Sequence, residues 1–466
     1  MVGGDPVVRR TARAAAALAL VAATACTTPQ ADDRVIYVAT GQDVSGNDLY
    51  LSLIQEWNAA QGPGGHRAYL VTLPGSADQQ YAEMVRDVQG GSPEYDVINI
   101  DNQFTAMFAE AGWIQEIGSG WQEADGAARA ADGNALTPVF REEVSRSVTY
   151  QDRVYAVPFT ADVGMLYYRR DLVGPGTLTA GRSLSGILAE LAEATGDTDV
   201  EHLYIGQFAQ YEGFTVNVME IVAAEGGSLV LPGEQRLADI HRNNAEHQAL
   251  NLIAEGFADG TFHPAALEST EEETYVRFLS GEAAAMRNWP LWYRRLLIAS
   301  TEQDSGHSPE YAVEALPGAL LGGQSLALTS GSPNEEAALD LIGFLTGTRQ
   351  QQVLFYCGGY APTRQDVYVE KLSPEDAAQL CAGYGVTGED AWHAEANQFL
   401  DTVRLAVDDA QLRPVTPYYS QFSEELSSGL RQLFLTAQYG GAAAVPLNTE
   451  RLEQIRTEAD NALYGR

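Results

Sequence analysis

Polar side chains follow two predicted buried strands, at positions where hydrogen-bonding chemistry toward a small ligand is feasible. Gln42 and Asp43 come after one apolar stretch, and Asp101 and Asn102 come after another. Amide and carboxylate groups offer several hydrogen-bonding atoms each. If the two stretches are parallel strands of one sheet, these side chains meet at its carboxyl edge, where open α/β proteins bind ligands.

A single carboxylate, Asp162, interrupts an otherwise apolar region at residues 154–168. Burial of an unpaired charge is unfavourable. We therefore expect Asp162 either to contact a ligand hydroxyl or to form a hydrogen bond within a hinge.

The elements that position these groups begin with an alternating pattern. Residues 35–40, 68–73 and 96–100 are predicted strands, and the two segments between them have the apolar spacing of amphipathic helices. This βαβαβ order predicts an α/β fold in which helices cover a parallel sheet.

Later segments are expected to cross between two lobes. Extended pieces at residues 154–159 and 164–168 flank Asp162, and a further extended piece at 310–316 precedes a strand at 322–328 and a helix at 334–345. A chain of 466 residues exceeds the ~250–300 residues that one hydrophobic core usually serves. Without a long linker, two lobes connected by several chain crossings are predicted.

The N-terminus predicts export. Three arginines, Arg9, Arg10 and Arg13, precede a small-apolar run at residues 14–23 that ends shortly before Cys26. This is the pattern of a signal peptide, residues 1–25, with a lipoprotein cleavage site. The run is too short to span a hydrocarbon core of ~30 Å. We expect acylation of Cys26, with residues 26–34 as a leash; cleavage nearby without a lipid is the alternative.

Cys357 and Cys381 are the remaining cysteines. In an oxidising compartment such a pair is expected to form a disulfide in preference to a metal site or a nucleophile.

The formal net charge of −35 argues against nucleic-acid binding, because a strongly acidic surface repels phosphates. The glycine-rich stretches lack the lysine and hydroxyl of a phosphate-binding loop. We expect no cofactor, no nucleotide and no metal.

Several motifs occur in an order typical of one family. They lie at residues 157–172, 210–213, 278–290, 316–318, 322–323, 362–364 and 413–414. In these the sequence resembles the extracellular solute-binding proteins of bacterial ABC sugar importers, those for trehalose and maltose above all. The resemblance spans nearly the whole mature chain and implies a two-lobe, periplasmic-binding-protein-like α/β fold with a ligand cleft and a multi-segment hinge.

The same resemblance implies lobe boundaries. Lobe 1 would contain residues 35–159 and 317–360, and lobe 2 residues 160–316 and 361–466. It also implies a binder and not an enzyme.

Resemblance places Trp289 as a ring that stacks on the sugar and Arg413 as a planar donor in the cleft. Tyr211 and Glu212 follow the same logic, and Gly323 belongs to the paired glycines. Core packing is the alternative for Trp289, and a solvated ion pair is the alternative for Arg413. The sequence departs from many relatives at Gln324, where they carry Trp, so one stacking face is missing and the sugar cannot be copied from the family.

The function expected from these observations is import of a small carbohydrate, trehalose, maltose or a related oligosaccharide, by an extracytoplasmic lipoprotein anchored to the cell membrane. Its partners would be an ABC permease with a separate ATPase, and the protein itself would be a monomer. Two alternatives are a glycoside hydrolase, which needs two carboxylates ~5–9 Å apart, and a surface adhesion or sensory lipoprotein without a transporter.

Overall fold

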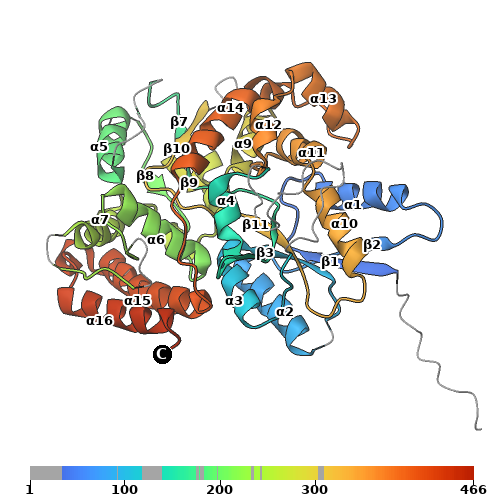
Figure 1. Ribbon diagram of the computed structural model, residues 1–466. Helices are drawn as coiled ribbons and strands as arrows, with labels where there is room; N and C mark the ends of the chain where they lie inside the picture. The colour runs from blue at the N-terminus through green and yellow to red at the C-terminus, as the bar shows by residue number, and fades with distance from the viewer. Residues whose placement is uncertain are drawn as a thin grey trace, which may run out of the picture.

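A computed structural model describes residues 34–91, 93–117, 139–174, 178, 183–196, 198–231, 236–241, 244–302 and 309–466. The predicted signal peptide, Cys26 and nearly all of the leash lie outside these residues. Two sheets, each covered by helices, form two lobes (Figure 1). The two-lobe α/β fold expected from the sequence is therefore confirmed.

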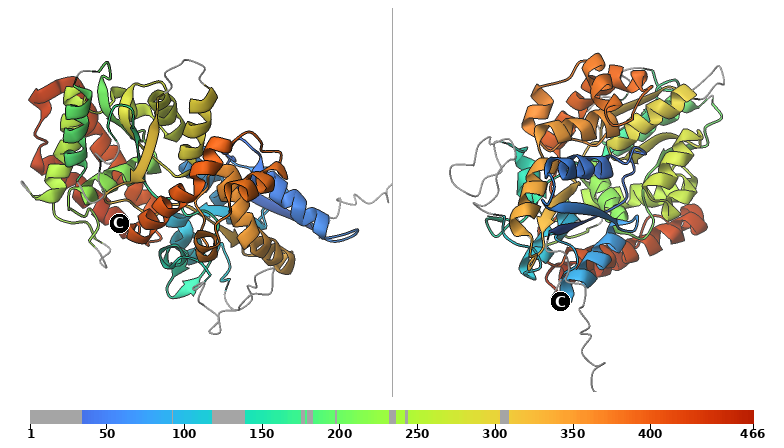
Figure 2. Two further views of the ribbon diagram at one scale, coloured as in Figure 1. Left: turned by 90° about the horizontal axis from the view of Figure 1, so that it is seen from above. Right: turned by 90° about the vertical axis from the view of Figure 1, so that its right-hand side faces the viewer.

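The first sheet has the strand order β2-β1-β3-β11-β6. Its parallel part is the predicted βαβαβ unit, formed by β1 (Val35–Thr40), α1 (Leu49–Ala60), β2 (Arg67–Thr72), α2 (Ala77–Gln89) and β3 (Val97–Asp101). Apolar residues such as Ile36, Val38 and Val97 are buried in the core. The right-hand view of Figure 2 shows α1 on one side of this sheet and α2 on the other.

Two antiparallel neighbours complete the first sheet. The predicted strand near residue 322 is β11 (Gln324–Leu328), which pairs with β3 on one side and β6 (Val157–Pro158) on the other. Gln324, the first residue of β11, pairs with Asp101, the last residue of β3. Because the chain enters β11 from the other lobe, it starts at the cleft edge and runs against β3. The sheet is therefore mixed and not wholly parallel.

The second sheet has the order β10-β7-β9-β8. β7 (Met165–Arg169) runs antiparallel to both β10 (Tyr311–Ala315) and β9 (Ala283–Asn288), and β8 (His202–Ile205) runs parallel to β9. Every residue of β9 is buried. Three small alanines at its start allow neighbouring elements to pack closely over the centre of this sheet.

Three chain segments cross between the lobes side by side. The first follows β6, where the sequence predicts a crossing, and the second precedes β11; Gly322 N donates to Asp162 O at 2.7 Å. The segment 310–316, predicted as the second crossing, instead contains β10, a strand of the second sheet. The third crossing lies around Gln411; the expected lobe boundary after residue 360 also implies a crossing, which stays a prediction. The backbone around Gln411 is joined to the second crossing, since Leu321 N donates to Gln411 O at 2.8 Å. The hinge is therefore a set of hydrogen-bonded strands.

Helices cover both lobes. In the second lobe α7 (Ala245–Asp259) and α15 (Tyr419–Gly440) pack together, and α16 (Thr449–Leu463) packs on α15. The other helices of the two lobes are α3 (Thr105–Glu110), α4 (Glu142–Ser147), α5 (Leu184–Thr195), α6 (Glu212–Ala224), α8 (Glu271–Leu279), α9 (Leu291–Glu302), α10 (Glu335–Leu345), α11 (Thr348–Gly358), α12 (Gln365–Val369), α13 (Pro374–Ala382) and α14 (Asp390–Asp409). Short pieces are η1 (Asn102–Phe104), η3 (Pro264–Glu268), η4 (Gly441–Ala444), β4 (Thr149–Tyr150) and β5 (Arg153–Val154).

The predicted disulfide is present. Cys357 at the end of α11 is bonded to Cys381 in α13. The division of the chain between lobes after residues 159, 316 and 360 stays a prediction.

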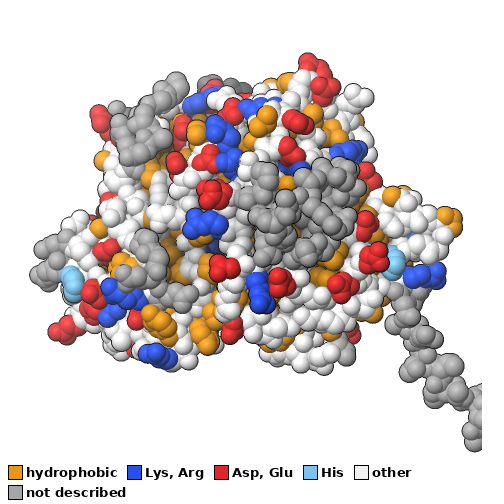
Figure 3. Space-filling model, viewed as in Figure 1, with side chains coloured by type: hydrophobic (Ala, Val, Ile, Leu, Met, Phe, Trp, Pro, Cys, Tyr) orange, Lys and Arg blue, Asp and Glu red, His pale blue; other side chains and the backbone are white. Residues whose placement is uncertain are grey.

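The acidic composition is visible at the surface. On the face drawn in Figure 3, acidic side chains lie interspersed with arginines over both lobes. Several arginines of the chain form ion pairs at the surface, such as Arg170 with Glu310 and Arg295 with Glu272. Among the described helices, none combines the length and apolarity needed to cross a membrane.

Candidate functional site

A cavity lies between the two sheets and contains about 930 Å³ of empty space, counted to its open mouth. Its walls come from both lobes and from the hinge. Nine of the eleven residues predicted to bind ligand line it: Gln42, Asp101, Asp162, Tyr211, Glu212, Trp289, Gly323, Gln324 and Arg413. The size is typical of a small-molecule site.

The structure does not bring Asp43 and Asn102 into the cavity lining. The Asp43 carboxylate accepts hydrogen bonds from Leu49 N at 2.6 Å and from Tyr360 Oη at 2.8 Å, so it holds the first turn of α1. Asn102 donates from Nδ2 to Gly322 O at 3.1 Å and accepts from Ser325 Oγ at 2.6 Å. These two side chains fix the backbone beside the cavity.

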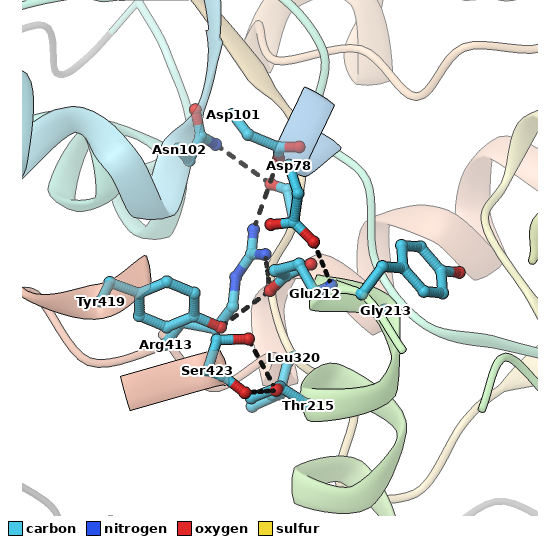
Figure 4. A network of polar contacts seen from close by, with 12 residues as sticks. Asp78, Asp101, Asn102, Glu212, Gly213, Thr215, Leu320, Arg413, Tyr419 and Ser423 are labelled. Atoms are coloured by element: carbon cyan, nitrogen blue, oxygen red, sulfur yellow. Dashed lines mark hydrogen bonds and ion pairs between the residues drawn. The ribbon is translucent and has the colours of Figure 1, made fainter. Parts of the chain in front are cut away.

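Arg413 is the centre of a buried polar network at one wall of the cavity (Figure 4). Its Nη1 donates to Glu212 Oε1 at 2.7 Å, and the same oxygen accepts from Tyr419 Oη at 2.7 Å. Its Nη2 lies 3.8 Å from Asp101 Oδ1 and has no hydrogen-bond partner. With 6% of its surface exposed, the guanidinium retains one free donor group next to the cavity.

Asp78 joins the two lobes beside this network, and sequence reasoning missed it. Its Oδ2 accepts a hydrogen bond of 3.0 Å from the backbone N–H of Glu212, the first residue of α6. Asp78 itself lies in the first turn of α2. In the sequence it looks like an acidic residue that complements a helix N-terminus, so no local signal distinguishes it.

Burial raises the pKa values of three carboxyls around the cavity. The pKa of Asp101 is raised to about 7, first by burial and then by the charges of Glu212 and Asp162, although Arg413 opposes the shift. Burial raises the pKa of Asp162 to about 6 against the hydrogen bond from Thr160. Burial and the Glu212 charge raise the pKa of Asp78 to about 6. The site therefore favours protons or other cations.

Trp289 forms the aromatic wall, where the sequence predicts a ring. The guanidinium of Arg287 lies over its ring, 3.7 Å from the ring centroid, and Arg287 is itself held by a two-point contact with Glu220 at 2.7 and 2.9 Å. Trp289 Nε1 donates to Glu271 Oε1 at 3.2 Å. The indole is thus fixed in position and half-buried.

Glu271 is a second cavity residue that the sequence did not reveal. It accepts from both Trp289 Nε1 and Tyr211 Oη, the latter at 2.9 Å. Glu271 lies at the start of α8, directly after Thr270, which forms a capping box with Glu273. An acidic run at a helix start is normally explained by the helix dipole, which hides the role of one member.

The paired glycines bring the hinge backbone to the cavity. Gly323 has a φ of 101°, and a Cβ there would lie 2.1 Å from Thr160 O, so only glycine fits. A Cβ on Gly322 would lie 3.2 Å from the Trp289 ring. Gln324 lines the cavity, and its Oε1 accepts from Asn99 Nδ2 at 2.9 Å.

The chain matches the sequence model of the bacterial extracellular solute-binding proteins over residues 53–382. A relative from Deinococcus radiodurans, described as a probable ABC transporter-binding protein, is 28% identical over 320 residues, which cover 66% of this chain and 71% of the relative.

Solved structures with the same fold include maltose-bound MalE3 of T. maritima, with a TM-score of 0.70, 22% identity and coverage of 92% of this chain and 99% of that one. The GacH receptor of Streptomyces glaucescens, solved in complex with acarbose, has a TM-score of 0.66 and 18% identity, and the match covers 92% of this chain and 97% of that one. UgpB of Mycobacterium tuberculosis, in complex with glycerophosphocholine, has a TM-score of 0.70 and 15% identity, and the match covers 92% of this chain and 98% of that one. The chain therefore belongs to the family of bacterial extracellular solute-binding proteins, which act outside the cytoplasm as binding proteins and not as enzymes.

Proposed function

We propose that this protein is an extracytoplasmic lipoprotein that binds a small carbohydrate between its two lobes and delivers it to an ABC importer. Trehalose, maltose and related oligosaccharides are the candidate ligands. The observation that carries the proposal is one cavity whose lining combines an immobilised indole, Trp289, with four buried or partly buried carboxylates and the guanidinium of Arg413.

This combination suits the chemistry of a sugar. A sugar ring has apolar C–H faces that stack on aromatic rings and a rim of hydroxyls that both donate and accept. Among the described residues, Asp162 Oδ1 is a buried acceptor without a hydrogen-bond partner, and Arg413 Nη2 is a buried donor without one. A hydroxylated ligand between them would satisfy both groups.

Family relatives support the ligand class and the transporter. MalE3 was solved with maltose, and the GacH receptor was solved with acarbose. The Deinococcus relative is described as a probable ABC transporter-binding protein. We infer that this chain likewise delivers its ligand to a permease whose separate ATPase supplies the energy, since the predicted cofactor-free protein would supply none.

The anchor is inferred from the cysteines. The chain has three, and Cys357 and Cys381 are joined to each other. Cys26, at the end of the predicted signal peptide, is the one left to carry a lipid. Metabolic labelling with a palmitate analogue should label the wild-type protein and leave Cys26→Ser unlabelled.

Closure would couple binding to delivery. Contacts between the lobes include Asp78 with the Glu212 N–H and Arg294 Nη1 with Ser45 O at 3.0 Å. We propose that a sugar contacting both walls adds to these contacts and shifts the population toward the closed state, which the permease recognises.

The test is calorimetric titration of the mature protein without Cys26 against trehalose, maltose, sucrose, longer glucans and monosaccharides. Saturable heat with a sugar supports the proposal, and deletion of the gene should then abolish uptake of that sugar. Binding with unchanged uptake would favour the alternative of a surface lipoprotein without a transporter. No binding to any sugar by a folded sample contradicts the proposal.

A further inference from the structure

Charge is unevenly distributed around the cavity between the lobes. Four carboxylates line it, and Arg413 is the one arginine among its lining residues. Lysine and histidine do not occur in the lining. The other nearby guanidinium, that of Arg287, is fully buried and engaged by Glu220. Its hydrogen-bonded partner is therefore behind the cavity wall, and its charge reaches the cavity carboxylate Asp162 only through space, where it partly opposes the rise in pKa that burial causes.

Arg413 neutralises only part of this negative charge. Its short contact, 2.7 Å, is with Glu212, whose Oε1 also accepts from Tyr419. Its distance to Asp101 is 3.8 Å, beyond hydrogen-bonding range. Asp101, Asp162 and Glu271 thus lack a hydrogen-bonded cationic partner among the described residues.

Asp162 is the least satisfied of these groups. Its Oδ1 is buried without a hydrogen-bond partner, and its Oδ2 has a long contact of 3.5 Å with Thr160 Oγ1. Asp101 and Glu271 both interact unfavourably with it through their charges. An acceptor-only group in this position requires a donor from outside the protein, and repulsion by two neighbours favours a charged donor.

On the basis of the proposed function, we infer that the natural ligand is an amino sugar, a saccharide whose ammonium group binds Asp162 between Asp101 and Glu271. The ring would stack on Trp289, and its remaining hydroxyls would meet Arg413 Nη2 and the other polar groups of the walls.

A metal ion does not fit the same charges. In the part of the chain that the structure describes, no three His, Cys, Asp or Glu side chains converge closely enough to hold one. A larger organic cation can reach carboxylates that are spread along two walls. Trp289 and Tyr211 provide apolar surface for a ring, which a linear polyamine would use poorly.

Proton binding by the empty site supports the inference. Burial raises the pKa of Asp101 to about 7 and that of Asp162 to about 6, so near neutral pH the site retains part of a proton in place of a cation. An ammonium ligand favours the ionised carboxylates. Its binding near pH 6.5 should therefore release protons to the buffer.

The experiment compares matched ligands. Glucose, maltose and trehalose are titrated at pH 7 beside their amino analogues, substituted at carbon 2, 3, 4 or 6, and the N-acetyl form of each analogue. At least one amino analogue should bind tenfold or more tightly than both its hydroxyl parent and its uncharged acetyl form. Its observed heat should vary with the ionisation enthalpy of the buffer at pH 6.5, in the direction of proton release.

Three other outcomes would contradict one or both proposals. If a neutral sugar binds and all amino analogues bind equally or more weakly, the charge inference is wrong and the proposed function stands. If choline or spermidine binds and no saccharide does, both the sugar class and the amino sugar are wrong. If a folded sample binds nothing in either set, both proposals are contradicted.

Variants separate charge recognition from general damage. Asp162→Asn keeps the shape and removes the charge, so the preference for the amino analogue over its hydroxyl parent should fall from tenfold toward one. Glu271→Gln should reduce the preference in the same direction. Asp199→Asn, an exposed carboxylate outside the cavity, is the matched control and should leave it unchanged. Equal weakening of both ligands in Asp162→Asn would overturn the assignment.

Discussion

The carboxylate of Asp78 in α2 accepts a hydrogen bond from the backbone N–H of Glu212 in α6, at 3.0 Å across the boundary between the lobes. Glu212 is at the same time the partner of Arg413. One residue of the second lobe therefore contacts the first lobe through its backbone and the cavity network through its side chain.

Loss of this contact should favour an open protein. Asp78→Ala removes a hydrogen bond to a charged acceptor, worth ~1.5–3 kcal/mol, so ligand affinity should fall at least about tenfold. Small-angle X-ray scattering of the ligand-free variant should show a larger radius of gyration. Glu83→Gln, on the same helix in a surface pair with Arg86, should change neither quantity. An unchanged radius and affinity in Asp78→Ala would contradict the role.

Trp289 should contribute to ligand affinity with little effect on the fold. Trp289→Ala removes the stacking ring, and we expect affinity to fall at least tenfold, ~1.4 kcal/mol, because the apolar face of the ligand loses its partner. Arg287 keeps both contacts with Glu220, so the core beneath remains paired. Calorimetric titration and circular dichroism provide the measurements. Trp113→Phe, packed on Phe108 in the first lobe, is the control that should bind normally.

Arg413 has a structural role as well as a place in the site. Arg413→Ala leaves the Glu212 carboxylate buried without its cation, so the free energy of unfolding should drop by about 3–5 kcal/mol and binding should be lost. The double variant Arg413→Ala with Glu212→Gln removes both charges. It should recover most of the stability in denaturant unfolding without recovering ligand binding. Failure of the second change to restore stability would show that the ion pair is not the cause.

The raised pKa values of Asp101, Asp162 and Asp78 predict a dependence of stability on pH. Each group binds a proton more readily in the folded state than in the unfolded chain, so its favourable contribution is complete below pH ~4 and is lost as pH rises through about 6 to 7. The melting temperature of the ligand-free protein should therefore gain from these groups as pH falls from 7.5 to 5.

The readout for this effect is a comparison between variants. Buried His263 and His393 have lowered pKa values, and because protonation of the unfolded chain is then favoured, they oppose the gain as pH falls through 6.5. Asp101→Asn keeps both histidines and removes one carboxyl whose pKa is raised. In calorimetric melting at each pH, the melting temperature of the wild type should rise relative to that of Asp101→Asn as pH is lowered. Parallel curves for the two proteins would contradict the prediction.

Local pattern was sufficient for much of the fold. Apolar runs of five or six residues with helical spacing between them predict β1 to β3 and the helices α1 and α2, because burial of those residues is what forms the elements. The third crossing, around Gln411, has no such pattern. Its extended form depends on two backbone hydrogen bonds to residues distant in sequence: Leu321 N donates to Gln411 O, and Gln411 N donates to Ala319 O.

The site could be predicted where a residue type was unusual in its surroundings. Asp162 within an apolar stretch and Trp289 before a proline both line the cavity. Asp78 and Glu271 escaped because acidic residues at helix starts have an ordinary local explanation. Asp43 shows the converse: its position after a strand suggested a ligand contact, yet its oxygens are used by the start of α1 and by Tyr360.

The three crossings are joined to each other by backbone hydrogen bonds and together form the hinge between the lobes. Bending all three strands together leaves their mutual bonds intact, whereas twisting one lobe against the other would shear the bonds between Gly322 and Asp162 and between Leu321 and Gln411. Opening is therefore confined to nearly a single coordinate. On the proposed mechanism, a bound ligand would therefore change one angle between the lobes, which a transporter would sense at the outer surface without contacting the ligand.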